Sequence, residues 1–445
     1  MPSRNAFKRK ARAIAIAISL SGTSALAHAG PLDELKAQID ALQRKVLELE
    51  QKQSAAQQKQ AEVADNVVTA GAAKGSFRLP ASNTSVTVGG YVKLDAVYSN
   101  PSAGVNSTAD LFLQPNTIAV GPGAGDNERS QLKLGARETR LFAKTSTPTS
   151  WGDLTTYVEG DFYGADGNES VTNSNGLRVR HAYGTLGNFL GGQTWTNFMY
   201  VPALPETLDF GGPVGQIFAR QAQVRWTQAQ DASALLGAGQ WSVALENPES
   251  VVTVPGGVAF RADDDRFPDL TGQRVFNTPN GKIAVSTVLR NIRADSKAPG
   301  VVDQAWGAAV NVAGIVPTVG RDDVRFLLAA GNAIGRYSNG FFPDGVVSAD
   351  GQIHLPRQWG WYAAYRHLWT DSLRSNFIVS GAGESNPAGS PASTNKSTQS
   401  AHVNLIWSPV ANTDVGVEYI YANRETEDGL KGHINRLQAS AKYTF

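Results

Sequence analysis

Arginines recur in this chain at positions that alternate with apolar residues. Arg178 and Arg180, for example, alternate with Leu177 and Val179. A guanidinium stays charged at any working pH and can hold a carboxylate through two parallel hydrogen bonds. Several arginines on the wet face of neighbouring strands would therefore attract small anions. The candidate pore-lining residues are Arg140, Arg178, Arg180, Arg220, Arg225, Arg290 and Arg366.

Acidic residues occur on the same predicted face. Glu159 and Asp161 belong to the alternating run that precedes Arg178. The alternative interpretation is therefore that the charges pair with one another and pack the wall. The sequence leaves open which charges cancel, and it does not identify the solute or the pore diameter.

The segment 197–218 is too apolar for a connection that lies free in water. Its bulky apolar residues are Phe198, Met199, Tyr200, Val201, Pro202, Leu204, Pro205, Leu208 and Phe210. Folding the segment inward would bury this surface and narrow a pore, and would place Arg220 near the narrowing. We therefore expect 197–218 to be an inward-folded constriction loop.

Signals of catalysis are weak. The six histidines show no metal-ligand spacing, the absence of cysteine excludes disulfides and thiolate sites, and no nucleophile elbow or phosphate-binding loop occurs. We interpret Asp263-Asp264-Asp265 as a solvated charge run in a loop. The sequence predicts no enzyme, metal or cofactor. An outer-membrane hydrolase that uses a Ser/His pair is the less favoured alternative.

Strands must position these arginines, because the pattern from Ser85 onward has a period of two. In the terminal stretch, Leu437 to Phe445 alternate with polar residues from Arg436 to Thr444. We count sixteen such runs, of which 188–196 and 268–276 alternate poorly. They span about 85–99, 130–145, 152–163, 176–187, 188–196, 219–228, 238–247, 268–276, 281–293, 302–315, 322–337, 357–370, 371–382, 398–408, 413–424 and 433–445.

The connections between these runs alternate in length. Long joins such as 100–129 and 197–218 follow the odd runs, and short joins such as Thr370-Asp371 follow the even runs. Tryptophans gather near the short joins and tyrosines near the long ones, as in two interfacial girdles. No apolar run of 18 residues exists. The sequence therefore predicts an all-β fold over 85–445, a 16-stranded antiparallel transmembrane β-barrel of the outer membrane.

The N-terminal part has a different organisation. Residues 1–29 resemble a signal peptide, with a basic start, a short apolar core and Ala27-His28-Ala29. Residues 30–60 predict a periplasmic α-helical coiled coil, and 61–84 a linker. The predicted seam positions are Leu32, Leu35, Ile39, Leu42, Val46 and Leu49. This composition favours two strands. The 40 basic and 39 acidic residues nearly balance, so nucleic acid is not an expected partner.

The chain resembles the DcaP-like outer-membrane porins. The resemblance rests on the signal peptide, the coiled coil, a sixteen-run barrel that ends in Phe, and three local stretches. These stretches are 90–96 (GYVKLDA), 208–213 (LDFGGP) and 220–226 (RQAQVRW). The resemblance implies a homotrimer that takes up small anionic solutes such as dicarboxylates, with pore arginines at Arg220 and Arg225.

These observations lead us to expect an outer-membrane porin, a diffusion channel biased towards small anions and surrounded by lipid. The alternative is a structural protein that contacts the cell wall through its periplasmic coiled coil and uses the barrel as an anchor.

Overall fold

The structure is a computed structural model of the chain. It describes residues 29–101, 111–122, 130–165, 167–168, 171–233, 235, 237–254, 258–262, 265–296, 301–348, 350–388 and 390–445. The predicted signal peptide lies outside the described residues, except for its last position. Two compact units are present, one up to Val67 and one from Val68 to Phe445.

The first unit contains one helix, α1 (Ala29–Asn66). The predicted seam residues from Leu35 to Leu49 are exposed on the isolated helix, and Leu42 is 62% exposed. The coiled coil itself stays a prediction. Among the described residues, no helix combines the length and hydropathy that crossing a bilayer requires.

The segment 61–84 is more ordered than a linker. Helix α1 continues to Asn66, and the short strands β1 (Thr69–Ala70) and β2 (Phe77–Arg78) then pair with each other. Strand β2 also pairs with the beginning of β3 (Ser85–Asn100), where Phe77 is opposite Val86. Gly75, in the turn of this small hairpin, has a φ of +78°.

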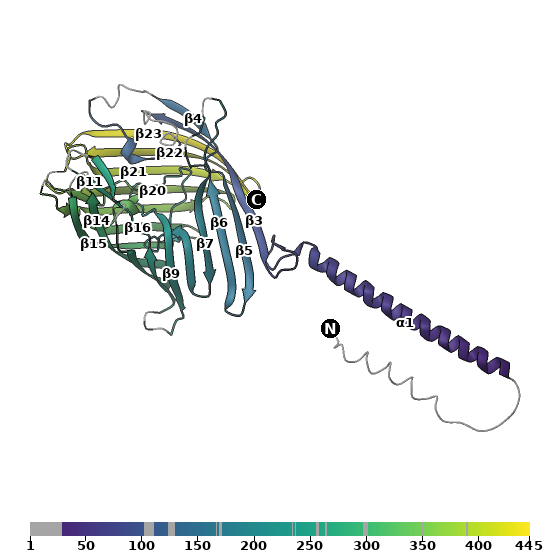
Figure 1. Cartoon of the computed structure of the whole chain (residues 1–445). Helices are drawn as coiled ribbons and strands as arrows, with labels where there is room; N and C mark the ends of the chain where they lie inside the picture. The colour runs from purple at the N-terminus through teal and green to yellow at the C-terminus, as the bar shows by residue number, and fades with distance from the viewer. Residues whose placement is uncertain are drawn as a thin grey trace. The chain divides into compact units, whose positions relative to one another are not determined.

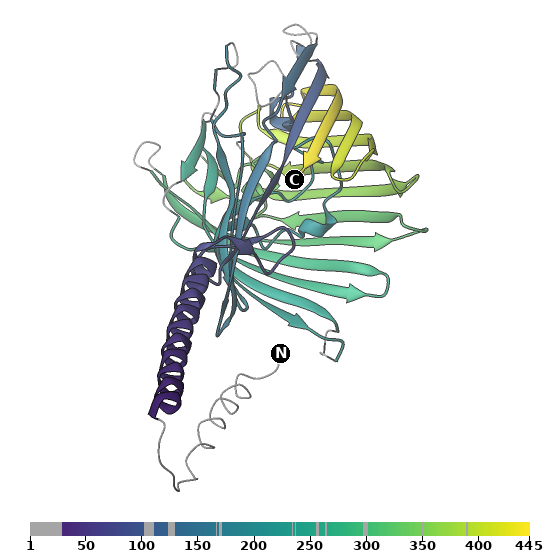
Figure 2. The same ribbon diagram turned by 90° about the vertical axis from the view of Figure 1, so that its right-hand side faces the viewer.

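The second unit is a closed antiparallel β-barrel (Figures 1 and 2). Its described residues form sixteen strand positions around the wall. The last strand pairs with the first, with Ala439 opposite Ala96. One strand position is made of two pieces, β4 and β5, which pair with successive parts of β3. The barrel strands after β3 are β4 (Gln131–Gly135), β5 (Arg140–Thr149), β6 (Gly152–Asp161), β7 (Arg178–Leu186), β8 (Phe189–Trp195), β9 (Arg220–Gln230), β10 (Gly239–Glu246), β13 (Asp269–Thr278), β14 (Gly281–Ser296), β15 (Val301–Pro317), β16 (Asp323–Gly331), β19 (Arg357–Leu368), β20 (Leu373–Ser385), β21 (Asn395–Trp407), β22 (Thr413–Thr426) and β23 (Lys431–Thr444).

The two faces of the strands differ as the alternation predicts. On β23, Leu437 is 55% exposed on the outer face, whereas Arg436 is 1% exposed on the inner face. All sixteen predicted runs contain a strand, including the two that alternate poorly. The run 322–337 is the least accurate, because β16 ends at Gly331 and a short helix, η4 (Gly335–Ser338), follows.

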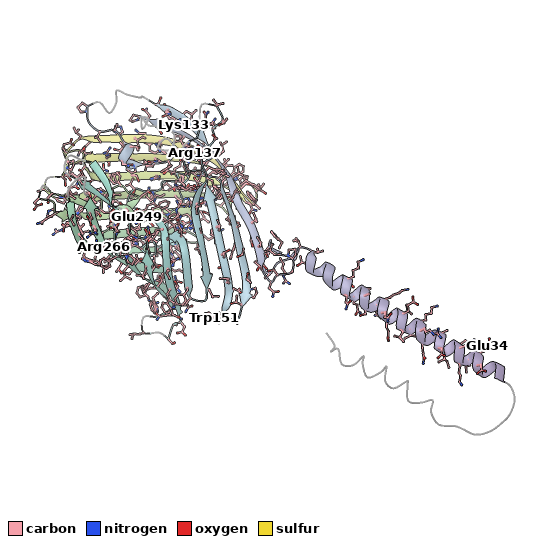
Figure 3. All side chains as sticks on the ribbon, in the orientation of Figure 1. Glu34, Lys133, Arg137, Trp151, Glu249 and Arg266 are labelled. Atoms are coloured by element: carbon pink, nitrogen blue, oxygen red, sulfur yellow. The ribbon has the colours of Figure 1, made fainter. Side chains whose placement is uncertain are left out.

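Short turns and long loops lie at opposite ends of the barrel. Trp151, in the turn between β5 and β6, is 81% exposed and lies at the end opposite Lys133 and Arg137 (Figure 3). Two of the long loops form a second sheet of β12 (Val258–Ala262), β11 (Ser250–Val254), β17 (Gly345–Val347) and β18 (Ile353–His354). A small core that includes Val252, Ile292 and Val347 attaches this sheet to the barrel wall.

The main hydrophobic core lies inside the barrel. Phe198, Met199, Ala203 and Ile217 of the segment 197–218 pack against inward side chains of the wall, such as Tyr362. This segment contains the short helix η3 (Val201–Ala203). Another short helix, η1 (Pro115–Thr117), belongs to the first long loop. Several of the apolar residues that suggested inward folding, among them Phe198, Met199 and Tyr200, therefore belong to the core inside the barrel.

Candidate pore site

The segment 197–218 is hydrogen-bonded along one arc of the barrel wall. Near its start, the backbone N–H of Asn197 donates to Oε1 of Glu246 on β10 at 2.7 Å. Further along, Oη of Tyr362 on β19 donates to the carbonyl of Ala203 at 2.9 Å. At the far side, Nζ of Lys93 on β3 donates to the carbonyl of Leu208 at 2.7 Å. The loop thus covers the wall from β10 round to β3.

Two arginines of the wet face hold the loop rather than face open lumen. Arg325 on β16 donates from Nη1 to the carbonyl of Leu204 at 2.6 Å. Arg374 on β20 holds the carboxylate of Glu206 with two hydrogen bonds, of 2.8 and 2.6 Å. A bidentate pair fixes both position and orientation. The tip of the loop is therefore anchored to the wall opposite β7.

The uncovered arc, from β5 to β9, carries five of the seven predicted arginines. The guanidinium carbons of Arg140, Arg178 and Arg180 lie 5.9, 5.4 and 5.6 Å from the ring centre of Phe210, which belongs to the loop. Arg220 lies 4.9 Å above the ring of Trp195 at the end of β8. The structure therefore brings four predicted arginines together around two aromatic rings. The fifth, Arg225, is on the inner face of β9.

Arg178 and Arg180 are neutralised by carboxylates. Arg178 donates twice to Asp161, at 3.0 and 2.7 Å, and Arg180 donates to Glu159 at 2.7 Å and to Asp161 at 2.9 Å. An irregularity between β6 and β7, at Glu159 and Gly160, shifts the register here. It places His181 as well as Arg180 on the inner face, as a bulge does. The pairing interpretation is thus correct for these two arginines.

The other three arginines of this arc have no ion pair within the described part of the chain. Nε of Arg140 and Nη1 of Arg220 are buried and have no acceptor there. Arg225 is likewise without a carboxylate at ion-pair distance among those residues. Burying donors of a charged group without an acceptor is costly. Among the described residues, the charges of these three guanidinium groups are therefore not compensated by a carboxylate.

Arg290 and Arg366 do not belong to this cluster. Arg290 on β14 is 1% exposed and pairs with Asp269 at 3.0 Å and with Asp344. Its guanidinium also donates to the carbonyl of Glu249 at 2.8 Å, so it fastens loop backbone at the mouth. Arg366 pairs with Asp323 near the short-turn end. Alternation places both on the inner face, but their partners come from other strands and loops.

Lys93, Glu138 and Phe210 belong to the site, although none was a predicted site residue. Lys93 pairs with Glu138 and lies 3.3 Å from Asp95, and Glu138 lines the same two cavities as Arg140. Lys93 was recognisable as a wet-face residue, since it alternates with Val92 and Leu94. The role of Phe210 has no signal in the sequence, because it depends on where the loop crosses the lumen.

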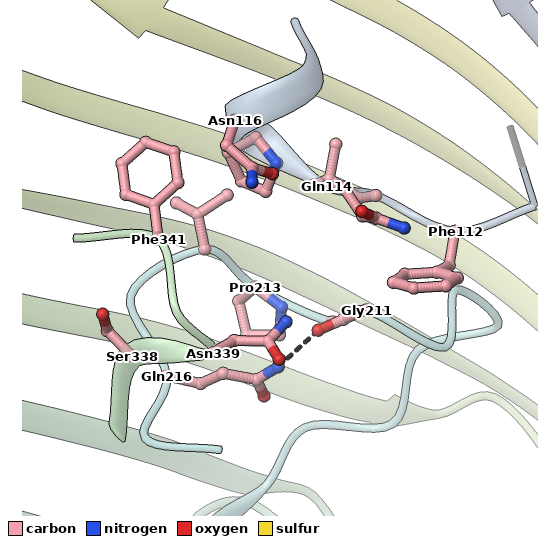
Figure 4. Close-up of a pocket in the computed structure, with 13 residues that line it drawn as sticks. Phe112, Gln114, Asn116, Gly211, Pro213, Gln216, Ser338, Asn339 and Phe341 are labelled. Carbon is pink, nitrogen blue, oxygen red and sulfur yellow. Dashed lines mark hydrogen bonds between the residues drawn. The ribbon is translucent and has the colours of Figure 1, made fainter. Parts of the chain in front are cut away.

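Three cavities follow one another past the loop. The first, of about 140 Å³, lies between η1, η4 and the loop segment that carries Pro213 and Gln216 (Figure 4). The second, of about 380 Å³, shares these two residues and is bounded by Arg140 and Arg180. The third, of about 220 Å³, reaches the short-turn end. The second and third share Glu138, Arg140, Glu206 and Thr207.

The chain matches the family model of the DcaP outer membrane protein over residues 18–445. The chain belongs to this family. The outer membrane channel DcaP of Acinetobacter baumannii has the same fold, with a TM-score of 0.71 and 24% identity over 85% of this chain and 100% of that one. OmpT, an outer membrane protein of Vibrio cholerae, matches with a TM-score of 0.50 and 10% identity over 81% of this chain and 98% of that one. No curated protein matches the chain.

Membership of the DcaP family confirms the resemblance and the location. The protein is an outer-membrane β-barrel of a channel family, with its N-terminal helix in the periplasm. The apolar outer face of the barrel meets lipid, and the short-turn end is the periplasmic end. The long loops, η1, η4 and the second sheet then lie at the outer mouth.

Asp209 joins two loops of this DcaP-family barrel and gives its stability a pH dependence. Its carboxylate accepts the backbone N–H of Leu113 at 2.8 Å and that of Gly212 at 2.9 Å. Burial raises the pKa of the Asp209 carboxyl from 3.8 to about 6. Because the folded-state pKa is the higher one, the contribution to stability is complete below about pH 4 and is lost as pH rises through about 6.

We expect this loss to appear in the thermal unfolding of the wild type and to be smaller in Asp209→Asn. The measured quantity is the difference in unfolding midpoint between about pH 5 and about pH 7.5, with the wild type more stable at the lower pH. Comparing the pH-dependent shift in unfolding midpoint of the wild type with that of Asp209→Asn removes the contribution of other titrating groups. An unchanged difference in Asp209→Asn would assign the pH dependence elsewhere.

Proposed function

We propose that the protein is a diffusion channel biased towards small organic anions. The observation that carries this proposal is the set of arginines on the uncovered arc that have no ion pair among the described residues. Arg140 borders both the second and the third cavity, so a solute that follows the cavities passes it. Arg220 and Arg225 lie on the neighbouring strands of the same arc. A local field from such groups can select anions although the net charge is close to zero.

In this proposal the segment 197–218 is the constriction. Its tip, Glu206 and Thr207, faces Glu138 and Arg140 across the junction of two cavities. The bidentate hold of Arg374 on Glu206 and the buried residues around Phe198 support a fixed narrowing. A solute would enter between the long loops, cross the arginine arc and leave beside Lys442.

The remaining parts of the proposal rest on the family and on the helix. Dicarboxylates are the first solutes to test, and a homotrimer is the assembly that we propose. The exposed seam of α1, with Leu35, Leu42 and Leu49 on one side, supports a coiled coil between copies of the chain. Contact of this coil with the cell wall is part of the same proposal.

Replacing Arg140, Arg220 and Arg225 by Gln together tests the anion bias. We expect the wild type to pass Cl⁻ more readily than K⁺ in planar bilayers, and the variant to lose or reverse this preference. At a water-filled wall each charge contributes about 1 kcal/mol at 4 Å, so each substitution should change the permeability ratio about fivefold. The measurement is the reversal potential in a KCl gradient.

Arg321→Gln is the matched control, because Arg321 pairs with Asp371 on the outside of a turn and both side chains are exposed. Its permeability ratio should equal that of the wild type. A wild type that prefers K⁺ would contradict the anion bias and leave the barrel intact.

A further inference from the structure

Aromatic rings follow the same arc as the arginines. Phe210 lies 5.2 Å from Phe112 and 4.6 Å from Tyr163, measured between ring centres. Trp195 lies 4.7 Å from Phe218 and 5.6 Å from His181. The contacts continue through Tyr157 to Tyr183 and Phe142 on β7 and β5. A row of touching rings thus runs from the outer loops towards the periplasmic half of the wall.

Four of these ring side chains border the cavity of about 380 Å³, namely His181, Trp195, Phe210 and Phe218. Trp195 and Phe218 rest with one side on the hydrophobic core of the lumen. Both are nevertheless partly exposed, as is Phe210. The volume falls within the range of about 300–1,000 Å³ that holds small organic ligands. One wall of this cavity is therefore formed by aromatic side chains. Aliphatic side chains would fill the same space if the wall served packing alone.

Arg140 and Arg220 turn the faces of their guanidinium groups to aromatic rings. Arg220 stacks on the indole of Trp195 at 4.9 Å, and Arg140 lies 5.3 Å from the ring of Tyr91 and 5.9 Å from that of Phe210. Stacking occupies the faces of a guanidinium, whereas hydrogen bonds leave from its edge. The buried Nε of Arg140 and Nη1 of Arg220 have no acceptor among the described residues. Arg140 lines the cavity, so its guanidinium is the group that a carboxylate there would meet.

The rest of the cavity sets the form of the solute. A group attached to a carboxylate at Arg140 extends along Trp195, Phe210 and Phe218, which line the same cavity. An aromatic ring presents positive edges to the negative faces of these rings, and such pairs contribute about 0.5–1.5 kcal/mol beyond the area that they bury. A saturated ring of the same size lacks this contribution.

We propose that the passage recognises aryl carboxylates. The carboxylate is held by Arg140, which lines the cavity, and the aromatic ring lies against Trp195, Phe210 and Phe218. The anionic half of this inference rests on the proposed function, and the aromatic half extends it. The arginine arc is then a binding site for a flat anion as well as a charge filter.

Benzoate and cyclohexanecarboxylate form the decisive pair, because they share the carboxylate and the ring size and differ in aromaticity. The purified full chain is placed in planar bilayers, and each anion is titrated while single-channel current is recorded. The measured quantity is the anion concentration at which the current is interrupted half as often as at saturation. We expect benzoate to act at about a fivefold lower concentration, which corresponds to about 1 kcal/mol. Trp195→Leu combined with Phe218→Leu should bring the two values together.

Trp195→Phe keeps an aromatic ring and should retain a preference for benzoate. This variant keeps the inference testable if the double leucine variant does not fold. Trp407→Leu, on the lipid face, is the matched control and should behave as the wild type. Chloride preference with equal action of the two acids would overturn this inference alone, whereas potassium preference would overturn the proposed function. Stronger action by glucuronate than by benzoate would also overturn it, since glucuronate is a cyclic anion without an aromatic ring.

Discussion

Removing residues 204–214 is expected to raise the single-channel conductance severalfold and to abolish the preference for Cl⁻. These residues carry the tip of the loop, with Glu206 at the junction of two cavities and Phe210 among the arginines. Both ends of the deletion lie against β19. Tyr362 binds the carbonyl of Ala203, and Gly215 touches the backbone of Gly360 so closely that a side chain would not fit. A short Gly-Ser linker can therefore join them.

The deletion leaves the buried part of the loop in place. Phe198, Met199 and Ile217 still fill the core, so the barrel should fold, and the shift in gel mobility between heated and unheated samples checks this. The conductance is then measured at several salt concentrations beside that of the wild type. A correctly folded deletion variant with unchanged conductance would show that another element limits the flow.

Arg290→Met is expected to destabilise the barrel by about 3–5 kcal/mol, because it leaves two buried carboxylates without their cation. The side chains of Asp269 and Asp344 are at most 1% exposed. The measurement is the midpoint of thermal unfolding in detergent. Arg321→Met is the matched control. It removes an exposed ion pair whose side chains are 65% and 93% exposed, and such pairs contribute at most about 1 kcal/mol.

The same pair of variants tests the structural role of Arg290 against the pore role predicted from alternation. A structural role lowers the unfolding midpoint of Arg290→Met and leaves the permeability ratio of the remaining folded protein unchanged. An unchanged unfolding midpoint together with a lower preference for Cl⁻ would show that Arg290 acts on the permeating ions and not on stability.

The barrel could be predicted from the sequence because each strand carries its own signal. Alternation, loop lengths and the terminal Phe445 are local features, and they located all sixteen barrel strands. The interruption between β4 and β5 was missed, although the alternation of residues 130–145 changes phase between Leu134 and Leu141. Residues 136–139 leave the ladder because β3 pairs first with β4 and then with β5. Pairing between distant segments decides this, and no single stretch contains it.

The site could be predicted only in outline. Alternation identified Arg178, Arg180 and Arg225 as inward, and the apolar content of 197–218 predicted that the segment folds inward. Which arginines are free depends on partners elsewhere in the chain. Arg180 meets Asp161 through a bulge, and Arg374 meets Glu206 across the lumen. The first contact depends on the register between β6 and β7 and the second on the path of the loop, and the composition of these segments determines neither.

The contacts of this loop constrain the order in which the protein assembles. The loop follows β8, yet its carbonyl at Leu208 accepts from Lys93 on the first barrel strand and from Gln438 on the last. Strands β3 and β23 come together only when the barrel closes. The full set of contacts at Leu208 can therefore form only once β23 has paired with β3. An open barrel, in which β3 and β23 are apart, cannot hold the loop by both of these hydrogen bonds.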